Sequence, residues 1–228
     1  DEALALRERH GVRLHADAAY GGFFALLDDL VPTKPFRAIA ECDSVVVDPH
    51  KHGLQPYGCG AVLFRDPAVG RLYKHDSPYT YFTFGDLHLG EISLECSRAG
   101  AAAAALWLTL RALDLKPILA AGVRAARAWA ALIEDSDVLR LYQPPELDIL
   151  TFFPAAATPA EVDAATARVL AEGMAEDDPV FLSTLRVDGM RILRSVLMKP
   201  EHEPHVPWLH ERVSALAADA LRTPPAAG

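Results

Sequence analysis

Two short segments constrain the fold of this chain more than any other feature. The first, His-Ala-Asp-Ala-Ala-Tyr-Gly-Gly at residues 15–22, ends a predicted strand on Asp17. The second, Asp-Ser-Val-Val-Val-Asp-Pro-His-Lys at residues 43–51, contains the β-branched run typical of a buried strand and ends on Lys51. About thirty residues separate the segments, which suits one crossover unit of a parallel sheet. We therefore expect Asp17 and Lys51 to lie at the carboxyl edge of an open α/β sheet, where such sheets bind ligands.

A lysine and an acid in this arrangement suit an aromatic aldehyde cofactor. The lysine amine condenses with the aldehyde, and a carboxylate that faces the ring nitrogen keeps that nitrogen protonated. Ala18 and Ala19 are small enough for a flat ring to lie against the backbone, and His50 can donate to a phosphate oxygen. Taken singly, Lys51 also fits a solvated loop residue and Asp17 a helix cap or a turn residue. The combination of the residues favours the cofactor site.

The 228 residues suffice for one large domain or two small ones. Strands and long helices alternate up to about residue 136. From residue 138 onwards, short strands surround a helix, and a final helix follows. We place a boundary near residue 115, which separates residues 1–115 from an α/β domain with an antiparallel sheet at residues 116–228. The pattern predicts strands at 12–16, 44–48, 60–64, 138–142, 148–153, 181–187 and 190–197, and helices at 2–10, 98–113, 117–136, 159–175 and 206–221.

Aromatic residues gather in a segment without hydrophobic periodicity at residues 73–97, which includes Tyr79 and Tyr81. A long loop of this kind inside a compact protein is usually functional or mobile. The alanine-rich helix that follows is apolar on most faces, so we expect it to be buried, with Trp107 at a core position. Pro32 and Pro35 predict a loop before the second strand.

Composition and charge exclude several classes of protein. The net charge of −9 and the scattered basic residues argue against binding to nucleic acid. The longest apolar run, at residues 99–110, is too short to cross a bilayer. Three cysteines without Cys-x-x-Cys spacing indicate a reducing compartment, so we expect a cytoplasmic protein. His202, His205 and His210 do not predict a metal site, because intervening prolines disrupt helical spacing and no acid or cysteine completes a ligand set.

In the two opening segments the chain resembles the group II pyridoxal-phosphate-dependent amino-acid decarboxylases, of the fold-type I aminotransferase superfamily. The resemblance continues through residues 57–66, 95–113 and 190–203. It spans nearly the whole chain, but only the second half of a typical family member. It implies that residues 1–115 are the C-terminal portion of the large cofactor-binding domain, with a mainly parallel sheet, and that the rest is the small C-terminal domain.

The resemblance also implies a role for individual residues. Lys51 matches the lysine that carries pyridoxal 5'-phosphate, and His50 matches the neighbouring residue that contacts the phosphate. Asp17 matches the partner of the pyridine nitrogen, and Ala19 matches the residue packed on the face of the ring. Asp48 matches a position near the phosphate that is often polar in the family.

Further roles concern the substrate and a proton donor. Arg194 resembles the late arginine that binds the substrate α-carboxylate, with Arg191 as the alternative. A loop tyrosine supplies a proton to the substrate in the family, and Tyr79 or Tyr81 is the candidate here. His52 is a departure, because family members often have an aromatic residue after the lysine.

The expected activity is pyridoxal-phosphate-dependent decarboxylation of an L-amino acid to the amine and carbon dioxide, with an aromatic substrate favoured by the aromatic segment. The alternatives are an aminotransferase, a carbon–carbon or carbon–sulfur lyase on the same scaffold, and a non-catalytic half of such an enzyme. The chain begins without methionine, directly with a helix and a strand. We therefore expect a second polypeptide that carries the missing N-terminal half, produced by cleavage or encoded separately, and a homodimer of complete protomers.

Overall fold

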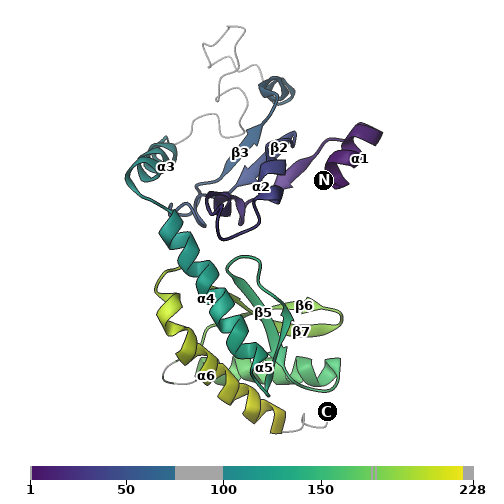
Figure 1. Cartoon of the computed structure of the whole chain (residues 1–228), viewed down its shortest axis with the longest axis vertical. Helices are drawn as coiled ribbons and strands as arrows, with labels where there is room; N and C mark the ends of the chain where they lie inside the picture. The colour runs from purple at the N-terminus through teal and green to yellow at the C-terminus, as the bar shows by residue number, and fades with distance from the viewer. Residues whose placement is uncertain (1, 75–99, 176, 178, 223–228) are drawn as a thin grey trace. The chain divides into compact units, whose positions relative to one another are not determined.

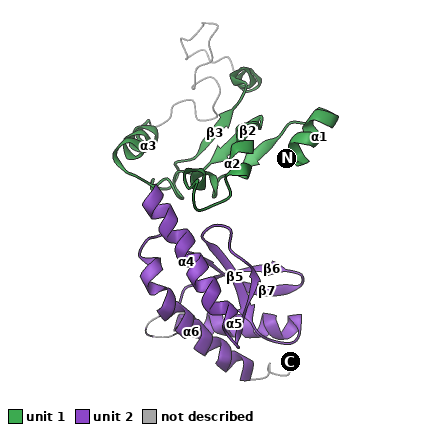
Figure 2. Cartoon of the chain, viewed as in Figure 1, with its two compact units in different colours: residues 1–115 green, residues 116–228 purple. Residues whose placement is uncertain are grey.

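The computed structural model describes residues 2–74, 100–175, 177 and 179–222 (Figure 1). The chain divides into two compact units, residues 1–115 and 116–228 (Figure 2). Both contain helices and β-sheet, which confirms the predicted α/β class.

The first unit is built on a three-stranded sheet in the order β1 (His15–Asp17), β2 (Ser44–Val47), β3 (Ala61–Phe64). Strands β1 and β2 are parallel, whereas β3 runs antiparallel to β2. The remaining elements of the unit are α1 (Glu2–His10), η1 (Gly22–Leu26), α2 (Thr33–Ile39), η2 (Pro67–Leu72) and α3 (Ala101–Ala112), of which η1 and η2 are 3₁₀ helices. The sheet is therefore mixed, with a parallel pair and one antiparallel edge strand.

Hydrogen bonds fix both ends of the parallel pair. At the amino end, the Asp43 carboxylate accepts the backbone N–H of Leu14 at 2.7 Å, and this bond holds the pKa of Asp43 below its ordinary value. At the carboxyl end, the N–H of Ala18 donates to the carbonyl of Val46 at 3.0 Å, and the N–H of Asp48 donates to the carbonyl of Ala19 at 3.1 Å. The segments that follow β1 and β2 therefore leave the sheet in contact with each other.

Two expectations for the first unit are wrong. Residues 33–39 form α2 where the prolines predicted a loop. Pro35 is the third residue of this helix, where the backbone nitrogen has no intrahelical partner and a proline removes no hydrogen bond. Helix α3 has no buried residue, and Trp107 is 59 % exposed, with Arg111 over its ring at 4.9 Å.

The second unit has a four-stranded antiparallel sheet in the order β4-β5-β7-β6. Its strands are β4 (Leu139–Gln143), β5 (Ile149–Pro154), β6 (Ser183–Val187) and β7 (Met190–Val196), and its helices are α4 (Lys116–Glu134), α5 (Pro159–Ala175) and α6 (His202–Arg222). One core joins all three helices to the sheet, and it includes Trp129 against Phe152 with ring centroids 5.2 Å apart. Asp188 and Gly189 have φ angles of 50° and 77°, which suits the tight hairpin turn between β6 and β7.

Helix α6 begins four residues earlier than the sequence predicts. Pro204 lies in its first turn, where the missing N–H is tolerated, and Pro207 lies inside the helix.

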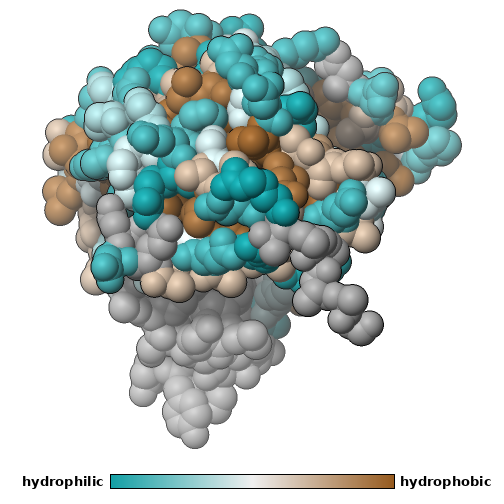
Figure 3. All heavy atoms as spheres, turned by 90° about the horizontal axis from the view of Figure 1, so that it is seen from below, coloured by the Kyte–Doolittle hydropathy of each residue, from teal (hydrophilic) through white to brown (hydrophobic). Residues whose placement is uncertain are grey.

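On the face of the molecule shown in Figure 3, hydrophobic residues reach the surface in separate patches among hydrophilic ones. Within the described part of the chain, no helix has the length and apolar character needed to cross a membrane.

Candidate cofactor site

Asp17 and the segment that carries Lys51 lie at the same edge of the first sheet. Asp17 is the last residue of β1 and stands opposite Val46 in the parallel pair. Lys51 follows the end of β2 after a turn in which its N–H donates to the carbonyl of Asp48 at 2.9 Å. Because parallel strands end at the same edge, both residues are at the carboxyl edge of the pair.

The amine of Lys51 faces a carboxylate. Its Nζ lies 2.8 Å from Oδ2 of Asp48, and the two side chains are 35 % and 18 % exposed. The lysine is thus half-buried at the sheet edge and accessible to a small molecule. Its reactive atom already has a defined partner.

His50 is held by the backbone of the following loop. Its backbone N–H donates to the carbonyl oxygen of Cys59 at 3.1 Å. Its ring Nδ1 lies 2.9 Å from the same oxygen and is also a donor, because a carbonyl oxygen can only accept. The other ring nitrogen, Nε2, lies 3.8 Å from Oδ2 of Asp48. The ring stacks on Tyr57 with centroids 4.9 Å apart. This arrangement leaves Nε2 as the atom that can meet a phosphate.

Asp17 and Ala19 form a tight turn beyond β1. Oδ1 of Asp17 accepts the N–H of Ala19 at 3.1 Å, which orients an otherwise exposed carboxylate. Ala18 is buried and Ala19 is half-buried, so small side chains line this part of the edge. An acid that is exposed and oriented in this way suits a partner with a ring N–H.

The loop after Lys51 is fixed by contacts that the sequence analysis missed. His52 is 4 % exposed and donates from Nδ1 to the carbonyl of Tyr20 at 3.0 Å. A Cβ on Gly53 would lie 2.7 Å from Cα of Pro49, so only glycine fits there. The amide of Gln55 donates to Thr109 on α3 at 2.9 Å. His52 was visible as a departure from the family pattern, but nothing in the sequence pointed to Gln55.

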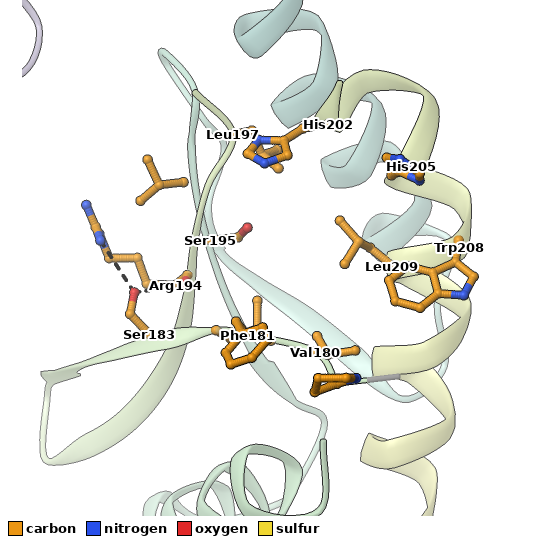
Figure 4. A pocket seen from close by; sticks show the side chains of 13 residues that line it. Val180, Phe181, Ser183, Arg194, Ser195, Leu197, His202, His205, Trp208 and Leu209 are labelled. Atoms are coloured by element: carbon orange, nitrogen blue, oxygen red, sulfur yellow. Dashed lines mark hydrogen bonds between the residues drawn. The ribbon is translucent and has the colours of Figure 1, made fainter. Parts of the chain in front are cut away.

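Arg194 lies in the second unit, on β7. Its guanidinium donates to the hydroxyl of Ser183 at 3.4 Å, and that hydroxyl donates to the Arg194 carbonyl at 3.0 Å. Figure 4 shows the guanidinium directed away from the space between β7 and α6, where a cavity of about 810 Å³ lies. Arg191 instead faces α5, because its N–H donates to Asp163 at 3.0 Å and its Nε lies 3.9 Å from the same carboxylate. Of the two arginines, Arg194 has the more available guanidinium.

The two candidate tyrosines, Tyr79 and Tyr81, lie outside the described residues. Among the residues that the structure describes, no three His, Cys, Asp or Glu side chains are grouped so that they could hold a metal ion.

The residues present fit pyridoxal phosphate. The accessible amine of Lys51 and the oriented carboxylate of Asp17 share one edge of the sheet. The small side chains of Ala18 and Ala19 follow Asp17 there. His50 adds a ring nitrogen that is not used by the Cys59 carbonyl. These are the groups needed to hold an aldehyde, a pyridine nitrogen and a phosphate.

Fold and site together define an α/β protein with a lysine and an acid at one sheet edge, and comparison with known proteins agrees. Residues 2–153 match the model of the pyridoxal-dependent decarboxylase conserved domain. The chain therefore belongs to the pyridoxal-dependent decarboxylase family, as its sequence motifs predicted.

Named relatives support this assignment, and a solved structure shares the fold. An L-tyrosine decarboxylase from Enterococcus faecium is 31 % identical over 59 % of this chain and 29 % of its own length. An aspartate 1-decarboxylase from Aliivibrio fischeri is 29 % identical over 93 % of this chain and 39 % of its own length. The crystal structure of Catharanthus roseus tryptophan decarboxylase with L-tryptophan matches with a TM-score of 0.78 at 20 % identity, over 95 % of this chain and 47 % of that one. The chain thus spans less than half the length of these relatives.

Proposed function

We propose that this chain is part of an enzyme that decarboxylates an L-amino acid to the amine and carbon dioxide with pyridoxal 5'-phosphate. The observation that carries the proposal is the placement of Asp17 and the Lys51 segment at one sheet edge. Membership of the decarboxylase family supports the choice of reaction.

Each residue has a defined task in this proposal. Lys51 would hold the aldehyde carbon of the cofactor, and Asp17 would keep a proton on the ring nitrogen. Ala19 would pack on the ring, while His50 and Asp48 lie on the side where the phosphate is expected. When bound, the cofactor supplies an electron-accepting ring that takes up the electron pair left by departing carbon dioxide.

Two further tasks concern the substrate. Arg194 would bind the α-carboxylate through its guanidinium, which suits a carboxylate by its planar shape. Tyr79 or Tyr81 would return a proton to the α-carbon. Replacing each tyrosine by phenylalanine tests this role: a decarboxylase should lose amine formation with one of the two variants, whereas a transaminase should be little affected.

Borohydride reduction followed by peptide mass mapping tests the cofactor assignment directly. The protein, supplied with pyridoxal phosphate and with a polypeptide carrying the first half of a family member, should acquire a phosphopyridoxyl group on Lys51. A Lys51→Arg variant should remain unmodified, and the other four lysines serve as internal controls. An unmodified Lys51 under these conditions would contradict the cofactor role and favour a non-catalytic half.

The substrate is proposed to be an aromatic L-amino acid. The aromatic residues at 73–97 support this choice, and relatives of this chain are named for tyrosine and for aspartate. Carbon dioxide release from L-tyrosine and L-aspartate, compared at equal concentration, decides between the two. Faster release from aspartate would overturn the aromatic assignment.

A second polypeptide that carries the N-terminal half is proposed as a partner. Its contact surface would include apolar side chains of the first unit, because Val62 and Leu63 on β3 and Leu108 on α3 are 54 %, 59 % and 58 % exposed. Sheets of this class normally have both faces covered. Co-expression should yield a stable complex, and light scattering should give two copies of each polypeptide, the homodimer of complete protomers.

Cell fractionation tests the proposed cytoplasmic location.

A further inference from the structure

Asp48 occupies a fixed position between β2 and Lys51. Its backbone N–H donates to the carbonyl of Ala19 at 3.1 Å, and its carbonyl accepts the N–H of Lys51 at 2.9 Å. With both backbone groups engaged, the turn fixes the position of the Asp48 backbone. That side chain is 18 % exposed and points its Oδ2 at Nζ of Lys51, 2.8 Å away.

The same oxygen lies near a second nitrogen. Oδ2 of Asp48 is 3.8 Å from Nε2 of His50. Because Nδ1 of His50 donates to the Cys59 carbonyl, Nε2 carries a proton only when the imidazole is charged. One carboxylate oxygen therefore pairs with the Lys51 ammonium and lies near a second nitrogen, which attracts it only when the imidazole is charged.

This geometry does not suit a direct contact between Asp48 and a phosphate. An ionised carboxylate can only accept hydrogen bonds, and a phosphate oxygen is likewise an acceptor with negative charge. Two such groups in contact repel each other unless a proton lies between them. The neighbours that Asp48 faces are basic, as the chemistry of a carboxylate requires.

We propose that Asp48 is a positioning residue that holds the ammonium group of Lys51 at the sheet edge before the cofactor binds. The proposal rests on the proposed function in so far as Lys51 is the cofactor lysine. Asp48 acts through the side chain of Lys51.

Competitive acetylation of the whole chain, without cofactor, tests this role. In trace amounts, acetic anhydride reacts only with the neutral form of an amine, which has a free lone pair. Mass spectrometry then compares the acetylation of Lys51 with that of the exposed Lys199 in the same molecules. The Asp48→Asn substitution should raise the ratio of Lys51 to Lys199 labelling about twofold to fivefold, the range expected for losing an ion pair that is partly exposed. Asp48→Glu, which keeps the carboxylate, should stay close to the parent ratio.

Two controls separate positioning from a general effect. Asp43→Asn removes the same charge at the other end of β2, where the carboxylate bonds Leu14, and should leave the ratio unchanged. In the parent protein, about 1 M salt should raise the ratio by screening the ion pair, and this rise should be absent from Asp48→Asn. The salt experiment needs no variant, so it holds even if a substitution prevents folding.

An unchanged ratio in Asp48→Asn with a native circular dichroism spectrum would overturn the proposal, as would an equal rise in Asp43→Asn. The absence of a salt effect on the parent ratio would also overturn it. Because no cofactor or substrate is used, these results leave the decarboxylase proposal standing. Failure of the borohydride experiment, in contrast, would contradict the cofactor role of Lys51 and leave only the ion pair between Asp48 and Lys51.

Discussion

His52 donates a hydrogen bond from Nδ1 to the carbonyl oxygen of Tyr20 at 3.0 Å, and so joins the loop after Lys51 to the segment after β1. Its ring meets those of Tyr20 and Phe24 edge-on, with centroids 4.5 and 4.7 Å away. We expect His52→Ala to lower the free energy of unfolding by about 2–4 kcal/mol, because a buried ring and its hydrogen bond are both lost. Urea unfolding followed by circular dichroism measures the change.

Two other substitutions show whether burial causes this loss. His52→Phe keeps a packed ring and loses the hydrogen bond to Tyr20, so it should destabilise less than His52→Ala. His15→Ala removes an exposed histidine that bonds the hydroxyl of Ser44 at 2.8 Å, and should cost no more than about 0.5–1 kcal/mol. Equal losses for His15→Ala and His52→Ala would contradict this account.

Gly53 is required by the close approach of the lysine loop to its neighbours. A Cβ at this position would lie 2.7 Å from Cζ of Phe23 and 2.8 Å from the carbonyl oxygen of Pro49. We expect Gly53→Ala to destabilise the protein by about 1–3 kcal/mol, because backbone atoms must move to make room. Trapping of pyridoxal phosphate on Lys51 should fall as well, since the loop that carries the lysine is displaced.

Gly100→Ala is the matched control for this prediction. A Cβ at Gly100 would meet no described atom within 4 Å, and its φ of −76° is accessible to alanine. The variant should trap the cofactor as the parent does. Parent-like trapping by Gly53→Ala would show that the loop tolerates the shift.

The placement of the site could be predicted because its signals are local. The run of three valines before Asp48 marks a buried strand, and the acid and lysine follow directly after strand ends. Parallel pairing then requires Asp17 and the Lys51 segment to share an edge. The position of Asp48 could not be predicted, because its backbone bonds Ala19, which is distant in the sequence, and also forms a turn with Lys51.

The errors in the fold have physical reasons. Pro35 and Pro204 read as loop residues in the sequence, but the first turn of a helix accepts proline. Trp107 was expected in a core because α3 is apolar, yet its ring is 59 % exposed. Apolar periodicity predicts that a face can be buried and does not identify what buries it. The long aromatic segment, which includes both candidate tyrosines, lies outside the described residues and stays a prediction.

Asp17 should be essential for the reaction and dispensable for attaching the cofactor. Asp17→Asn keeps the size of the side chain but replaces the carboxylate by a neutral amide, which does not stabilise a protonated ring nitrogen. In a complex with the first-half polypeptide, we expect decarboxylation to fall at least about a hundredfold, the scale of other groups that control a reacting proton. Borohydride trapping on Lys51 should persist. Loss of trapping together with activity would instead indicate a role in folding.

The ion pair between Arg124 on α4 and Glu203 on α6 should make stability depend on pH. The guanidinium donates from Nε and Nη2 to the two carboxylate oxygens at 2.7 and 2.8 Å, and these bonds hold the pKa of Glu203 below its ordinary value of 4.5. Because the folded pKa is the lower one, the stabilisation is complete above the ordinary pKa and is lost as the pH falls through the folded pKa. Both side chains are partly exposed, so we expect Glu203→Gln to cost only about 0.5–1 kcal/mol near neutral pH.

Urea unfolding at a series of pH values measures this contribution. The difference in unfolding free energy between the parent and Glu203→Gln should be constant near neutral pH and should shrink as the medium becomes more acidic than the ordinary pKa of the carboxyl group. Glu211→Gln, an exposed position on the same helix, is the control and should show no such trend. A difference for Glu203→Gln that persists at acidic pH would mean that the glutamate stabilises α6 by packing, because a protonated carboxyl group no longer pairs with Arg124.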